Sequence, residues 1–135
     1  AVLALNYAID FPQRVKSLIL IAPQYNMPKF LLKVQNVLFK FMPKSQFGDI
    51  GLTKKDFITL TNSMADMDFT NGLENVSCPV LVLCGEKDNV NKKAAIKIAE
   101  KLSGAKFSTI ENSGHEVNID NPNGLAKAIE ALNVD

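Results

Sequence analysis

The stretch that decides the fold reads CPVLVLCGEKD, from Cys78 to Asp88. Five consecutive apolar residues, 80–84, stand between a proline and Gly85, a pattern typical of a strand buried on both faces of a parallel sheet. Asp88 follows just beyond the carboxyl end of this strand. Because ligands and catalytic groups gather at that edge of open α/β sheets, Asp88 is a candidate functional residue.

Two further segments have the pattern of parallel strands, and helices alternate with them. Residues 18–21 (LILI) form a short continuous apolar run, and residues 106–110 (KFSTI) are less apolar and are expected nearer a sheet edge. Helical spacing of apolar residues predicts helices over 1–9, about 95–102 and 121–132, the last beginning at the capping pair Asn121-Pro122. The sequence therefore predicts an α/β fold with about three parallel strands and covering helices.

Residues 24–77 lack strand patterns and contain helical segments instead. Apolar residues repeat at helical spacing after residue 29 and again after Thr53, where TKKD resembles a capping box. We predict a helical insertion over 24–77, with the α/β core formed by 1–23 and 78–135. Five phenylalanines of the insertion could line an apolar pocket, although packing within the insertion itself is the commoner role of such residues.

Composition excludes several classes of function. The chain has 135 residues, 47% hydrophobic and 21% charged, and its net charge is +1. Such a balance provides no field that would attract nucleic acid or an anionic membrane surface. Since no apolar run approaches the roughly 18 residues of a membrane span and no leader precedes the first helix, we expect a cytoplasmic protein.

Cys78 and Cys84 are expected to be unpaired, and no metal site is expected. Six positions along one strand separate them by roughly 20 Å, too far for a disulfide. With a single histidine in the chain and no cysteine pair, a zinc site has too few ligands. No organic cofactor is indicated either.

The only histidine, His115, follows the third strand segment in the loop Ser113-Gly114-His115. One strand–helix–strand crossover separates Asp88 from His115, so both residues are expected at the same edge of the sheet. A histidine oriented by a carboxylate serves as general base for a hydroxyl or thiol nucleophile. A lone histidine is more often structural, and an acid after a strand is often only a helix cap, but their joint placement favours a catalytic pair.

These motifs together resemble the C-terminal half of the α/β-hydrolase fold superfamily. The GEKD turn matches the family's strand-end acid at Asp88, and the SGH loop matches its base at His115. The resemblance also implies that residues 1–8 form the helix after the nucleophile and that the insertion is a cap. It implies a carboxylesterase- or lipase-like hydrolase acting on a small apolar ester or amide, through a serine, Asp88 and His115. Relatives of this fold also cleave carbon–carbon bonds, open epoxides or remove halides.

The sequence departs from the family pattern at several points. It contains no G-x-S-x-G nucleophile motif, and the position after the acid where relatives often carry proline is Asn91. Some relatives place the acid after the preceding strand, but Pro23-Gln24 stands there. We expect the serine upstream of Ala1, and we therefore expect the chain alone to be inert. We also expect it to be a truncated or proteolysed form, or a dimer joined through an open sheet edge.

Two other classes of function remain open from the sequence. The chain could be a non-catalytic α/β module that binds a small molecule or a partner and uses Asp88 and His115 structurally. In that case the titration of His115 should be indifferent to Asp88→Asn. A flavodoxin-like or nucleotide-binding domain is disfavoured, because no glycine-rich phosphate loop joins a strand to a helix.

Overall fold

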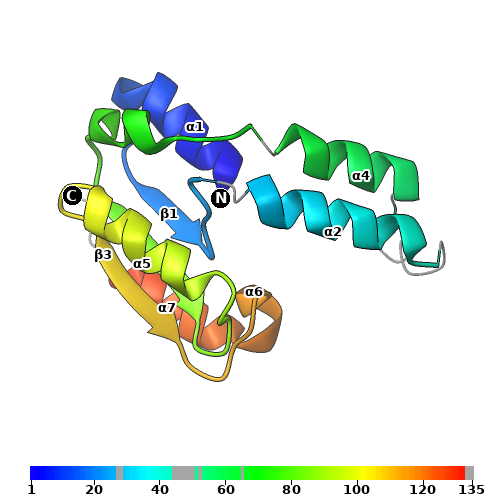
Figure 1. The fold of residues 1–135 in the computed structure, drawn as a ribbon. Coiled ribbons are helices and arrows are strands. Elements are labelled where there is room, and N and C mark those ends of the chain that lie inside the picture. The colour runs from blue at the N-terminus through cyan, green and yellow to red at the C-terminus, as the bar shows by residue number, and fades with distance from the viewer. Residues whose placement is uncertain (27–28, 44–50, 52, 65, 133–135) are drawn as a thin grey trace. The chain divides into compact units, whose positions relative to one another are not determined.

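A three-stranded parallel sheet organises the α/β part of the chain (Figure 1). The computed structural model describes residues 1–26, 29–43, 51, 53–64 and 66–132. In chain order its helices and strands are α1 (Val2–Asp10), η1 (Pro12–Arg14), β1 (Leu18–Ile21), α2 (Lys29–Phe41), α4 (Lys54–Ser63), η2 (Thr70–Asn75), β2 (Val80–Gly85), α5 (Lys92–Lys101), β3 (Lys106–Ile110), α6 (Val117–Asp120) and α7 (Pro122–Glu130).

The strand order is β1-β2-β3, so the strand predicted from residues 80–84 lies at the centre of the sheet. Every residue of β2 is buried, which is why its sequence is apolar throughout. Ile21 of β1 pairs with Leu83, and Gly85 at the end of β2 pairs with Ile110 of β3. The predicted α/β fold with three parallel strands is confirmed. Because the strands are parallel, their carboxyl ends all lie along the same side of the sheet.

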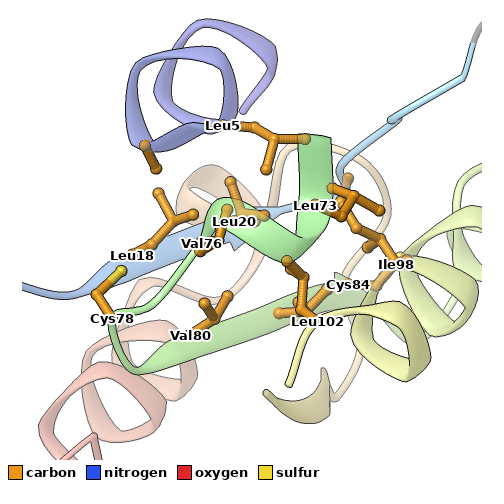
Figure 2. Packing of buried hydrophobic residues seen from close by; sticks show 14 residues of the cluster. Leu5, Leu18, Leu20, Leu73, Val76, Cys78, Val80, Cys84, Ile98 and Leu102 are labelled. Atoms are coloured by element: carbon orange, nitrogen blue, oxygen red, sulfur yellow. The ribbon is translucent and has the colours of Figure 1, made fainter. Parts of the chain in front are cut away.

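One face of the sheet packs against α1, η2 and α5 (Figure 2). Alternate residues of β2 point to this face, and among them Val82 and Cys84 are fully buried. Leu5 of α1 and Ile98 of α5 contribute to the same core. The side chains on one face of β2 therefore pack against the apolar faces that helical spacing predicted for α1 and α5.

The other face is covered by α6 and α7. Leu81 and Leu83, the intervening residues of β2, form its core with Ile110 and Val117, and the apolar side of α7 packs on them. The side chain of Asn121 accepts a hydrogen bond from the Gly124 N–H at 2.8 Å, so the expected capping pair does begin α7. Helices on both faces explain why an uninterrupted apolar strand is stable here.

A second compact unit comprises residues 26–68, and its described residues include α2 and α4. The rings of Phe39 and Phe57 meet edge to face with centroids 5.0 Å apart. Thr53 caps α4, its hydroxyl oxygen accepting from the Asp56 N–H at 3.2 Å. Lys54 donates to the carbonyl oxygen of Lys40 at the end of α2. Two aromatic residues of the insertion thus serve its internal packing.

The bounds of this unit differ from those expected of the insertion, 24–77. Gln24, Tyr25 and residues 69–77 group with the α/β unit instead. Leu73 and Val76 are buried in its core beside α1, because the short helix η2 packs there. The segment is too short for a helical repeat of apolar residues to be visible in the sequence.

The central strand provides a test of this core. We expect Val82→Ala to lower the free energy of unfolding by about 2–3 kcal/mol, because Val82 is fully buried and its removal leaves a cavity. The matched change Val90→Ala, at a side chain that is 84% exposed, should cost less than about 0.5 kcal/mol. Urea unfolding measures both, and equal losses would contradict the assigned burial.

Candidate functional site

Asp88 lies in the tight turn that joins β2 to α5. Its backbone N–H donates to the carbonyl oxygen of Gly85 at 3.1 Å, and its own carbonyl oxygen accepts from the Lys92 N–H at 3.0 Å. The carboxylate atom Oδ1 accepts from the Asn91 N–H at 3.1 Å. These bonds hold a buried acid at the carboxyl end of the central strand.

The loop that carries His115 is fixed by several backbone hydrogen bonds. The Lys87 N–H donates to the Ser113 carbonyl oxygen at 2.8 Å, which ties this loop directly to the acid turn. The Gly114 N–H donates to Asp120 Oδ2 at 2.6 Å, and the fully buried Ser113 hydroxyl donates to the Glu111 carbonyl oxygen at 3.1 Å. These hydrogen bonds therefore fix the two residues that precede His115.

Gly85 allows the two loops to come together. A Cβ atom at this position would lie 1.9 Å from the Gly114 carbonyl oxygen and 2.5 Å from that of Ser113. Real Cβ contacts are never this close, so any side chain here would push the two loops apart. The glycine that ends the apolar run is thus required for space.

His115 and Asp88 meet at this edge. Nδ1 of His115 is 3.0 Å from Oδ2 of Asp88, and the two side chains are 68% and 4% exposed, respectively. Because an ionised carboxylate only accepts, the contact requires a proton on Nδ1 and leaves the lone pair on Nε2. Asn91 Nδ2, 3.1 Å from Nδ1, is itself a donor, so within the part of the chain that the structure describes the hydrogen bond of the protonated Nδ1 goes to Asp88. Because the side chain is largely exposed, the Nε2 lone pair is available to accept a proton.

Asp88 is held in its ionised form. Burial raises the pKa of its carboxyl group, but hydrogen bonds from His115 and Asn91 lower it by more, so the net pKa lies below the ordinary value. An acid that stays ionised is a constant acceptor for the imidazole proton.

Two residues of this site were not predicted from the sequence. The side-chain Nδ2 of Asn91 lies 2.9 Å from both carboxylate oxygens of Asp88 and 3.1 Å from His115 Nδ1. Gln24, beyond the end of β1, donates from Nε2 to Asn91 Oδ1 at 2.8 Å. The signal that could have found them is their position, since polar residues after parallel strands meet at one edge.

The cysteines do not supply a nucleophile to this pair. Both are free and buried, as expected from the sequence. Burial, followed by the negative charge of Asp88, raises the pKa of the Cys84 thiol, and burial also raises that of Cys78. Protonated thiols in a core are poor nucleophiles.

The described residues offer neither a metal site nor a membrane-spanning helix. No group of three or more histidine, cysteine, aspartate or glutamate side chains there could hold a metal ion. No helix in that part of the chain is long and apolar enough to cross a membrane. A depression of about 390 Å³ between β3 and α7, with Ser108 and Lys127 in its lining, contains neither Asp88 nor His115.

Comparison with solved structures identifies the fold. The chain resembles a hydrolase from Pseudomonas aeruginosa PA01 (TM-score 0.80, 16% identity, 96% of this chain and 60% of the other). It also resembles the enol-lactonase from Burkholderia xenovorans LB400 (0.78, 13%, 95% and 60%) and an esterase from Exiguobacterium antarcticum (0.77, 18%, 95% and 61%). No protein-family profile and no curated protein matches. The chain thus has a partial α/β-hydrolase fold and spans about 60% of the length of these structures.

Gly85→Ala tests the close approach of the loops. Because the new methyl group must displace backbone, we expect the free energy of unfolding to fall by about 3 kcal/mol. Gly104→Ala is the matched control: Gly104 has φ +71° and nothing near its missing Cβ, so only backbone strain of about 1 kcal/mol is expected. Urea unfolding compares the two, and a loss at Gly85 no larger than at Gly104 would contradict the close contact.

The pH dependence of stability tests the ionised state of Asp88. Its pKa is lower in the folded than in the unfolded chain, so the unfolded chain binds more protons and stability rises with pH. The contribution is complete above the unfolded value, about 3.9, and is lost as pH falls through the lower folded pKa. Between pH 5 and pH 2 the wild type should therefore lose more stability than Asp88→Asn, with His115→Gln in between. Parallel slopes in urea titrations at each pH would contradict this assignment.

Proposed function

We propose that this chain supplies the acid and the base of an α/β hydrolase that cleaves small apolar esters or amides. The observation that carries the proposal is the contact of 3.0 Å between the exposed imidazole of His115 and the buried carboxylate of Asp88. In this reading His115 is the general base and Asp88 orients it. The nucleophile is a serine hydroxyl outside this sequence.

The proposed reaction uses each nitrogen of His115 for a separate task. Nε2 removes the proton of the serine hydroxyl as its oxygen attacks the substrate's carbonyl carbon, and then returns that proton to the departing alcohol or amine. Water repeats the sequence on the acyl-enzyme and releases the acid. Throughout, Nδ1–H donates to Asp88, which stabilises the imidazolium as it forms.

Ester and amide cleavage is favoured over other chemistry of this fold for two reasons. A general base that faces solvent suits proton transfer from a hydroxyl nucleophile. The similar structures include an esterase and an enol-lactonase. The chain by itself is expected to be inactive, because an oxyanion hole alone contributes about 10²–10³ in rate and the proposed serine lies elsewhere.

A non-catalytic module is the second candidate. One observation favours it, since Asp88 Oδ1 accepts from the Asn91 N–H and so also stabilises the turn before α5. The exposure of His115 argues against a purely structural histidine, because a ring that is 68% exposed contributes little packing.

Ester hydrolysis by the full-length protein tests the proposal. With 4-nitrophenyl acetate and butyrate as probes, Asp88→Asn should lower kcat by about 10⁴ and His115→Gln by at least about 10³, with KM little changed. The matched control Asp10→Asn changes an exposed acid at the end of α1 and should keep wild-type rates. Activity retained within tenfold in both site variants would refute the proposal, as would full-length protein that hydrolyses neither ester.

A further inference from the structure

A series of side-chain hydrogen bonds connects the residues that follow the carboxyl ends of all three strands. Gln24 follows β1, Asn91 and Asp88 follow β2, and His115 follows β3. Each contact between neighbouring side chains in the order Gln24, Asn91, Asp88, His115 is 3.0 Å or shorter. This series of hydrogen bonds therefore runs past the carboxyl ends of all three strands and ends at the imidazole.

A turn of the backbone after β1 places Gln24 in this series of hydrogen bonds. The Ala22 N–H donates to the Leu83 carbonyl oxygen at 2.8 Å, which continues the pairing of β1 with β2 for one more residue. Ala22 has φ 47°, in the left-handed region that costs a residue with a side chain about 1 kcal/mol or more. Pro23 and Gln24 follow directly, so this strained turn sets the direction in which the glutamine side chain leaves the sheet.

The amide of Asn91 has one workable orientation. Its nitrogen faces both oxygens of Asp88, and its oxygen faces the donor Nε2 of Gln24. Reversal would set an amide oxygen 2.9 Å from each carboxylate oxygen with no proton between them, and would set two amide nitrogens against each other. Asp88, which only accepts, and Gln24 together hold Asn91 in the orientation in which it donates to the acid.

This orientation also affects His115. Asn91 Nδ2 lies 3.1 Å from Nδ1, but two donors do not bond each other, so Asn91 acts on the ring through Asp88. Its side-chain amide and its backbone N–H together hold both oxygens of that carboxylate in place. If the carboxylate rotated away, Nδ1 would lose its acceptor and the ring could carry its proton on Nε2, the tautomer that has no free lone pair toward substrate.

We propose that Asn91, oriented by Gln24, is a positioning residue that fixes the Asp88 carboxylate and thereby keeps the neutral His115 in its Nδ1–H tautomer. The inference concerns the same pair as the proposed function, and its consequence for catalysis rests on that function. Its consequence for the tautomer does not, because the hydrogen bonds themselves determine the tautomer.

The experiment is ¹⁵N NMR of the imidazole in the full-length protein, with His115 assigned by comparison with His115→Gln. At a pH where the ring is neutral, the wild type should show protonated Nδ1 and unprotonated Nε2. Asn91→Ala removes the side-chain donor but keeps the backbone N–H, and Gln24→Leu removes the group that orients it. Both should shift the ring at least several-fold toward Nε2–H, raise the pKa of Asp88, and lower kcat roughly tenfold at unchanged KM.

Two controls separate positioning from general loss of structure. Asn89→Ala removes an exposed asparagine in the same turn and should leave the tautomer and kcat unchanged. Val82→Ala destabilises the core without changing any residue of this series of hydrogen bonds, and it should also leave the tautomer unchanged.

The outcomes distinguish this inference from the proposed function. If the wild type has the Nδ1–H tautomer and it depends on Asp88 but not on Asn91 or Gln24, the positioning role is refuted and the acid–base pair stands. If Asp88→Asn leaves the tautomer unchanged, the pair fails and both proposals fail with it. A shift in both amide variants, absent from both controls, supports the positioning role even if no hydrolysis is detected.

Discussion

The buried carboxylate of Asp88 is the constraint on which this edge of the sheet depends. A charged group removed from water is very costly unless hydrogen bonds replace its hydration. Here the donors are the backbone N–H and side-chain amide of Asn91 and Nδ1 of His115. They come from two loops that must approach closely, and Gly85 provides the space for that approach. Neither loop could move away alone without leaving the acid short of donors.

Much of this arrangement could be predicted from the sequence because it follows from patterns of apolar residues. The runs 80–84 and Leu18–Ile21 predicted two buried strands, because a parallel sheet covered on both faces requires continuous apolar segments. The order of strands and crossovers then placed Asp88 and His115 at one edge. Their contact of 3.0 Å agrees with that placement, while their catalytic role stays a prediction.

What could not be predicted depends on side-chain direction or on short irregular segments. Gln24 and Asn91 are common polar residues, and no spacing rule reveals that their amides meet across 67 positions of sequence. Similarly, the packing of η2 against α1 depends on Leu73 and Val76, two apolar residues in a segment too short to show a period. The end of α4 at Ser63 also falls before Met64 and Met67, which continue its apolar spacing in the sequence.

The unequal exposure of the pair argues that stability does not explain it. An ion pair or hydrogen bond with one partner 68% exposed contributes little to folding, since water competes for the exposed group. Burial of the Asp88 carboxylate, by contrast, opposes ionisation and has to be offset by the neighbouring donors. A buried acid whose hydrogen bond orients an accessible imidazole agrees with the proposed role in proton transfer, because a base must reach its substrate while the group that orients it stays fixed.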